Sequence, residues 1–364
     1  MKNMRIITIV CWLITALVLV GLAVWFLTGT MFGIGSGRWN SNWYSGINIE
    51  GWELLSGPYN VVGEYSYGVA GVDSLNIDWI AGDVTVKPYD GNDFRITEFA
   101  QRELRENERL FVSMSGGTLT VKYIERSISV RMPQKKVEVL IPRTLSENLN
   151  RLDVDSVSGA IFIESVSADT LNANSMSGSI STSSSTARSL DLNSTSGSLT
   201  VESVRADSMK LDSMSGSMHI SGSTAKTLDC GTTSGSINVS GAFDSVKLNS
   251  MSGRLTLDNS APASAVTADS TSGSLELSGS FDRASVDSMS GSVEIRSSIV
   301  PGSLKVDTVS GRITVAIPNE GTITVNHSSV SGSFSSDIPI VIQKSGANLT
   351  LSTMSGGTSI IEYK

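Results

Sequence analysis

The sequence contains few of the residues that carry catalytic chemistry or cross-links. Two cysteines, Cys11 and Cys230, are too few for a disulfide framework or a cysteine-based metal site. The histidines are also two, His219 and His327, whereas the Ser-Gly pairs that would supply a nucleophile recur along the whole chain. Because no single serine is distinguished, we expect a protein that is not an enzyme and that holds no metal and no cofactor.

Positive charge is scarce as well. Lys and Arg number 27 against 35 Asp and Glu, and the resulting net charge of -8 argues against nucleic acid as a partner. Aromatic residues make up 6% of the chain and hydrophobic residues 40%. This composition excludes a disordered chain, and 364 residues leave room for one long domain or two ordinary ones.

One long apolar run lies at the N-terminus. Residues 6–27 read IITIVCWLITALVLVGLAVWFL and contain no charged side chain. At about 1.5 Å per residue, a helix of this length crosses a hydrocarbon core of about 30 Å. Lys2 and Arg5 precede the run and no basic cluster follows closely, so the positive-inside rule places the N-terminus in the cytoplasm. A cleaved signal peptide is the competing interpretation.

The rest of the chain is dominated by a repeat with a period of about 19 residues. Apolar residues stand seven and five positions before a Ser-Gly glycine, as in Leu190 and Leu192, and two and four positions after it, as in Leu199 and Val201. Each unit therefore predicts two short strands, and the change of phase at the glycine predicts a sharp corner. The corner glycines are Gly159, Gly178, Gly197, Gly216, Gly235, Gly253, Gly273, Gly291, Gly311, Gly332 and Gly356.

A unit of 19 residues cannot bury its own apolar side, but stacked units bury a continuous ladder of Leu, Val and Ile. We therefore predict an all-β fold: a parallel β-solenoid with layers of about 19 residues, preferably right-handed, preceded by one transmembrane α-helix. The predicted segments are a cytoplasmic stub and anchor (1–30), a Gly/Ser/aromatic tether (31–72) and the solenoid (73–364). Within the solenoid, residues 73–154 form irregular capping turns and 155–364 the regular repeats.

The position two residues before each corner glycine forms a stripe of Met, Thr and Val. If these side chains point outward, they form a narrow apolar seam along the stack, suited to a partner, a glycan or a second copy of the solenoid. If the corner curls, they are tucked under the return loop and are purely structural. The candidate binding residues are Met176, Thr195, Met214, Thr233, Met251, Thr271 and Met289, and Val157, Val309, Val330 and Met354 share their position.

Charged residues form two further patterns. Four residues before the corner, Asp and Asn recur and are expected to stack in an outward ladder, as in the successive Asp269, Asp287 and Asp307. A divalent cation would relieve their repulsion, but the Gly-Asp nonapeptide of calcium-binding β-rolls is absent, which favours a solvated ladder. Basic residues concentrate between 95 and 136, either to meet anionic headgroups or wall polymers, or as a solvated face paired with nearby glutamates such as Glu98.

Two isolated residues have structural interpretations. His327 occupies a slot that is apolar in most layers, which favours an interior histidine or a distorted turn over a catalytic base. Cys230 occupies the equivalent slot, where Ala173 and Ala268 also appear, and is interpreted as a small buried hydrophobe.

Three stretches carry a resemblance to a known family. The segments SLNIDWIAGDVTVKPYDGNDFRI and VEVLIPRTLSENLNRLDVDSVSGAIFI, followed by the serial SxSGxI layers, resemble the bacterial "putative adhesin" domain family, also called Toastrack, from about residue 73 to 364. The resemblance implies association with the cell envelope and, in some members, with membrane-stress systems. It implies no catalytic residues.

The sequence thus predicts a non-enzymatic, single-pass protein of the cytoplasmic membrane that displays its solenoid outside the cell membrane for binding or scaffolding. Expected partners are the membrane itself and cell-wall polymer, glycan or envelope proteins, with self-association as a further option and nucleic acid excluded. Two alternatives stay open. One is an envelope-stress sensor acting through a membrane partner, and the other is a polysaccharide-active β-helix enzyme.

Overall fold

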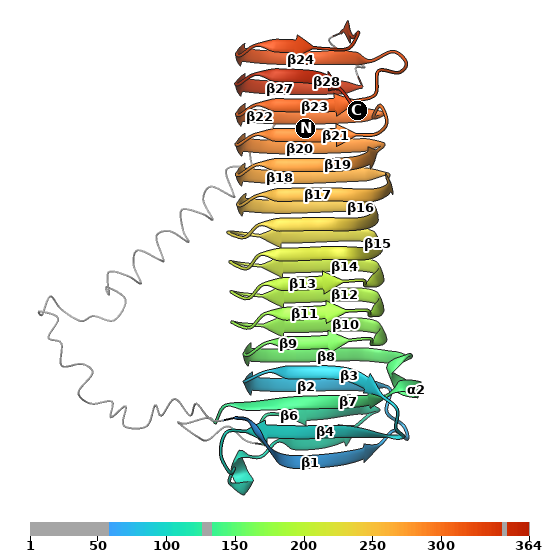
Figure 1. Cartoon of the computed structure of the whole chain (residues 1–364), viewed down its shortest axis with the longest axis vertical. Coiled ribbons are helices and arrows are strands. Elements are labelled where there is room, and N and C mark those ends of the chain that lie inside the picture. Colours follow the sequence, from blue (N-terminus) through green and yellow to red (C-terminus); the bar gives the residue numbers. More distant parts are fainter. Residues whose placement is uncertain (1–57, 126–132, 344–347, 364) are drawn as a thin grey trace, which may run out of the picture. The chain divides into compact units, whose positions relative to one another are not determined.

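The computed structural model describes residues 58–125, 133–343 and 348–363. The predicted transmembrane segment 6–27 lies outside these ranges, and among the described residues no helix is long and apolar enough to cross a membrane. The strands of the described part belong to one hydrogen-bonded assembly and stack in layers (Figure 1).

Each regular layer contains one strand before the corner glycine and one after it. Both strands pair in parallel with their counterparts in the adjacent layers, so that Leu190 lies between Leu171 and Met209. The chain therefore forms the parallel β-solenoid that the period of about 19 residues predicts, while its handedness stays a prediction.

The strands before the corners form one continuous ladder: β2 (Ser74–Ala81), β8 (Leu149–Ser158), β10 (Ser167–Ser175), β12 (Thr186–Ser194), β14 (Arg205–Ser213), β18 (Ala265–Ser272), β20 (Arg283–Ser290), β22 (Ser303–Ser310), β24 (Thr324–Ser331) and β27 (Leu349–Ser355). The strands after the corners form the other: β3 (Val84–Tyr89), β9 (Ile161–Glu164), β11 (Ile180–Ser183), β13 (Leu199–Glu202), β17 (Leu255–Ala263), β19 (Leu275–Phe281), β21 (Val293–Ser297), β23 (Ile313–Ile317), β25 (Phe334–Ser336) and β28 (Thr358–Glu362). The long strands β15 (Met218–Thr232) and β16 (Ile237–Ser252) pass from one ladder into the other.

The core lies between the two ladders. The apolar residues that define the repeat are buried, as Leu192 and Val201 show with no exposed surface. Cys230 is also fully buried, in register between Leu211 and Leu248, which confirms it as a small hydrophobe of the core. Burial of such apolar rows in every layer is the main source of stability.

The corner glycines stack directly on one another. A Cβ atom at Gly178 would lie 1.7 Å from the Gly159 carbonyl oxygen, and one at Gly216 would lie 1.9 Å from that of Gly197. Ser213 holds its corner in shape, because its Oγ accepts the Gly216 N–H at 2.8 Å. No side chain fits in this column, which explains why glycine returns in every layer.

The N-terminal end is closed by strands that depart from the repeat. β6 (Thr118–Lys122) and β7 (Lys135–Pro142) extend the two ladders outward in parallel from β2 and β3. β5 (Phe111–Ser115), β4 (Asp93–Ala100) and β1 (Asn60–Gly68) then add in antiparallel, on β6, β7 and β4 respectively. The short helices η3 (Glu106–Glu108) and α2 (Arg143–Ser146) lie in the connections.

The prediction of a tether over residues 31–72 is wrong for the last part of that range. Residues 60–68 form β1, because β4 offers an unpaired edge and because Tyr65 and Tyr67 pack against the core. The remainder of the tether up to residue 57 lies outside the described residues.

At the C-terminal end the last two layers are exchanged relative to the sequence. β22 pairs with β27, and β27 pairs with β24, so that the final segment of the chain lies between two earlier ones (Figure 1). β28 lies in the same way between β23 and β25, and the glycine column runs Gly311, Gly356, Gly332. β26 (Val341–Ile342) pairs with the outer layer at β24.

The glycine column predicts a sharp difference between neighbouring substitutions. Gly216→Val is expected to lower the free energy of unfolding by more than about 3 kcal/mol, because its Cβ clashes with a backbone oxygen. Ser213→Ala should cost about 1 kcal/mol through the lost hydrogen bond. Ser215→Ala, at an exposed side chain, is the control and should be near neutral. Urea unfolding followed by circular dichroism measures all three, and a stable Gly216→Val protein would contradict the stacking.

The buried thiol gives a second prediction. Burial raises the pKa of Cys230, so the reactive thiolate is disfavoured as well as inaccessible. Iodoacetamide should leave Cys230 unmodified in the folded protein and modify it in denaturant, as read by peptide mass spectrometry. Fast labelling without denaturant would show that these layers open.

Candidate functional site

The stripe two residues before the corner glycines forms an exposed row, here called the seam. Its methionine side chains are about half exposed, from 49% at Met251 to 59% at Met214. Thr195 and Thr233 are exposed in the layers between. The alternative in which a curled corner tucks these side chains under the return loop is therefore wrong. In order along the stack, the seam consists of Val157, Met176, Thr195, Met214, Thr233, Met251, Thr271, Met289, Val309, Met354 and Val330.

Backbone pairing fixes the direction of these side chains. Met176 N–H donates to Ser156 O at 3.1 Å, and Met214 N–H donates to Ser194 O at 3.2 Å, which holds the seam residues in the ladder. In ten of the eleven layers the residue before the seam position is a buried Ser or Thr, such as Ser175, and in the outermost layer it is the half-buried Ser329. By alternation, the seam residue therefore faces outward. The alternation of side chains along each strand thus determines both which residues are buried in the core and which residues form the seam.

The row on the corner side of the seam is almost free of charge, whereas the Asp/Asn ladder runs along its other side. The residue after each seam position is an exposed serine in all eleven layers. Across the glycine column, only Arg254 and Arg312 bring a charge into the next row. An apolar stripe beside uncharged hydroxyls loses little solvation energy when another surface covers it. The flanking serines are Ser158, Ser177, Ser196, Ser215, Ser234, Ser252, Ser272, Ser290, Ser310, Ser331 and Ser355.

The Asp/Asn ladder is stacked as expected. Asn174 Nδ2 donates to Asp155 Oδ1 at 2.8 Å, and Asn193 Nδ2 donates to Asn174 Oδ1 at 3.0 Å. These side chains help to line a shallow polar pocket of about 260 Å³. Amide groups thus satisfy the carboxylate in this part of the ladder, which favours a solvated row over a cation site.

Where the ladder consists of successive aspartates, at Asp269, Asp287 and Asp307, the negative charge is neutralised in a different way. Burial, and next the neighbouring Asp287 carboxylate, raise the pKa of Asp269. Lys305 Nζ lies 3.9 Å from Asp287 and also pairs with Asp307, so a lysine supplies the positive charge here. Within the described ranges, no group of three or more His, Cys, Asp or Glu side chains is arranged to hold a metal ion.

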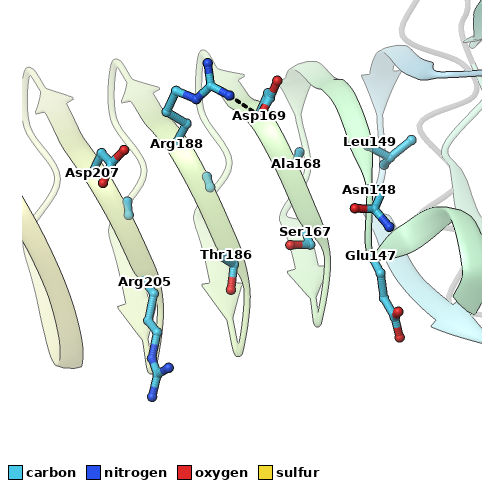
Figure 2. Close-up of a pocket in the computed structure, with 12 residues that line it drawn as sticks. Glu147, Asn148, Leu149, Ser167, Ala168, Asp169, Thr186, Arg188, Arg205 and Asp207 are labelled. Atoms are coloured by element: carbon cyan, nitrogen blue, oxygen red, sulfur yellow. Dashed lines mark hydrogen bonds and ion pairs between the residues drawn. The ribbon is translucent and has the colours of Figure 1, made fainter.

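A groove on the opposite edge was not predicted from the sequence. It measures about 420 Å³ and has a floor of small side chains, among them Ala168, Ala187 and Ala206, which pair in register. Figure 2 shows Arg188 reaching to Asp169 of the preceding layer, a pair that measures 2.9 Å. These alanines recur every 19 residues in the segments that lead the chain from one layer to the next. Their spacing is the sequence signal that could have predicted this groove. At this point of the rim, the Arg188 and Asp169 charges neutralise each other.

The basic segment between 95 and 136 contains one residue that is not available to any surface. Lys135 is fully buried and its Nζ lies 2.7 Å from Glu98 Oε1 and 2.7 Å from the Glu108 carbonyl oxygen. Its ammonium group also lies 4.1 Å from the centre of the Tyr123 ring. Burial lowers the pKa of Lys135, and the Glu98 carboxylate opposes this. The expected pairing with Glu98 exists, but as a buried clamp rather than a solvated face.

The two histidines lie apart from any catalytic arrangement of the described residues. His219 is exposed on β15, in register between Thr200 and Asn238. His327 sits in register with the core residue Leu351, stacks on Phe334 at 4.6 Å and has its pKa lowered by burial. His327 thus occupies the predicted slot but is only half-buried, and its Nε2 has no hydrogen-bond partner among the described residues.

The buried clamp predicts a strong effect of one conservative change. Glu98→Gln is expected to lower the free energy of unfolding by about 3 to 5 kcal/mol, because it leaves the Lys135 ammonium buried without a countercharge. The double variant Glu98→Gln with Lys135→Met should regain much of this loss. Denaturant unfolding of the single and double variants checks both statements, and additive losses would contradict the coupling.

Three solved structures are similar to the chain at low identity. They are a "putative adhesin" from Bacteroides fragilis (15% identity, TM-score 0.28, 82% of this chain and 96% of that one), another from Parabacteroides merdae (13%, 0.38, 83% and 96%) and a "putative lipid binding protein" from Parabacteroides distasonis (14%, 0.31, 83% and 96%). TM-scores this low carry no argument about this chain. Curated proteins give no match.

The family profile is more informative than these structures. The profile described as Toastrack DUF4097 matches residues 72–244 and again residues 241–360, which together cover well over half of the sequence. These two ranges include both solenoid ladders and the whole seam from Val157 to Met354. The chain therefore belongs to the Toastrack DUF4097 family.

Proposed function

We propose that the protein is a non-enzymatic cell-envelope protein that displays its solenoid for binding or scaffolding, with adhesion as one form. The observation that supports this most is the seam, a continuous exposed apolar row over eleven layers beside an uncharged serine row. Repetition suits weak contacts that add up along an extended partner, because each layer offers a similar contact at about the same spacing.

The proposed location is the cytoplasmic membrane, with the N-terminus inside and the solenoid outside. It rests on the uncharged run 6–27 and on Lys2 and Arg5 before it. The chain enters the solenoid at β1, so an anchor in that run would attach at the N-terminal end of the stack.

An enzyme acting on polysaccharide is the less favoured function. It would require an acidic group and a base in adjacent layers, free to act on a sugar. Several of the carboxylates described above, such as Asp155 and Asp169, are instead bonded to an Asn or Arg of a neighbouring layer. Wild-type protein that turns over no member of a broad glycan panel would exclude this function.

Binding through the seam is tested with the full chain in mild detergent. The expected partners are purified cell-wall polymer, anionic lipid vesicles and whole cells, each assayed by co-sedimentation. A variant with Met176, Met214, Met251 and Met289 replaced by serine should bind at least about tenfold more weakly, since it removes the apolar contacts. Met114→Ser is the control, because Met114 is 51% exposed but lies on β5, away from the seam.

Two results would contradict the proposal. If the four-methionine variant binds as well as the wild type, the seam is not the binding edge. If the wild type binds none of the three surfaces, adhesion to envelope components fails, and the scaffold or sensor functions with membrane partners remain to be tested.

A further inference from the structure

The seam has a regular alternation that appears only in the folded chain. In sequence order its last four members read Met289, Val309, Val330, Met354, which breaks the alternation. Because the last two layers are exchanged, their spatial order is Met289, Val309, Met354, Val330. Long methionines therefore occupy every second layer from Met176 to the end, with Thr or Val between them.

This alternation creates a row of knobs and gaps. Layers about 4.8 Å apart place successive methionines about 9.6 Å apart, with a shorter β-branched side chain in each gap. A complementary surface must present its own long apolar side chains at the same spacing, shifted by one layer. The seam of a second copy has this spacing by construction.

We infer that two copies of the chain pair along their seams in antiparallel orientation, with the methionines of one copy seated over the Thr and Val residues of the other. This inference rests on the proposed function, because it takes the seam as the binding edge. It names the partner as a second copy of this chain rather than a wall polymer or a lipid surface.

Symmetry selects the antiparallel arrangement. In a parallel pair with a two-fold axis along the stack, each layer faces itself, so every methionine meets a methionine. The layers are numbered here from 1 at Val157 to 11 at Val330, so that the methionines occupy the even-numbered layers. An antiparallel two-fold pair can place every even-numbered layer of one copy against an odd-numbered layer of the other, and such an isologous contact is closed. Two registers achieve this over ten of the eleven layers. In the register that covers the strongly exposed Val330, the facing pairs are Met176 with Val330, Thr195 with Met354, Met214 with Val309, Thr233 with Met289, and Met251 with Thr271.

Charge permits this pairing, and the small contact area makes it weak. A chain with a net charge of -8 repels its copy over most of its surface, but the seam and its serine row carry no charge. A strip of about 50 Å by about 10 Å covers roughly 500 Å² on each copy, which is less than the roughly 800 Å² of a stable interface. The pairing is therefore weak in dilute solution and becomes effective when chains are concentrated on a surface.

Cross-linking of the full chain tests the orientation and the register. In a Cys11→Ser background, a Thr195→Cys chain is mixed with chains carrying Met289→Cys, Val309→Cys or Met354→Cys, and disulfide-linked dimers are measured after mild oxidation. Strongest linkage to position 354, or to position 289 in the second register, supports the proposal. Strongest linkage to position 309, or between two Thr195→Cys chains, overturns it, because those positions face each other only when methionine meets methionine.

Sedimentation velocity over a range of concentrations separates this inference from the function on which it rests. The chain should associate reversibly, Met114→Ser should not alter the dissociation constant, and the four-methionine variant should raise it at least about tenfold. If the wild type stays monomeric at all concentrations and gives no cross-links, yet loses polymer or vesicle binding in the four-methionine variant, self-pairing is refuted while the seam remains the binding edge.

Discussion

The structure depends on the close approach of backbone at the corner column. Each glycine lies so near the carbonyl of the glycine below that a single Cβ would overlap it by more than an ångström. This contact sets the distance between layers at one edge, and the backbone hydrogen bonds set it along the strands. Everything else in a layer, including the core rows, the polar ladder and the seam, takes its place relative to that column.

The solenoid and the seam therefore have one origin. Alternation along a strand sends the residue before a seam position inward and the seam residue outward, so Ser213 is buried and Met214 is exposed. The hydroxyl inside shapes the corner, and the thioether outside is left for contact with another surface. A chain that repeats this sequence motif in every layer therefore forms both a core and an external apolar row from one repeat.

Much of this architecture was predictable from the sequence, because period and alternation are local signals. The buried rows and the corner glycines follow from the spacing of Leu, Val, Ile and Gly alone. The order of the last layers did not follow, since equivalent residues in two layers compete for the same slot and the period cannot rank them. The exposure of the methionines was one of two open interpretations, and the burial of Lys135 against Glu98 depends on a contact 37 residues away in the sequence.

The exchange of the last two layers also has a consequence for biosynthesis. In the finished fold, β27 and β28 lie between the layer of β22 and β23 and the outer layer of β24 and β25. During synthesis, the layer formed by β22 and β23 gains its final neighbours only when the last residues emerge. A chain that stops short of residue 349 thus lacks the layer on which β24 and β25 rest in the finished fold and exposes a bare sheet edge, which gives a cell's proteases a direct means of recognising incomplete copies.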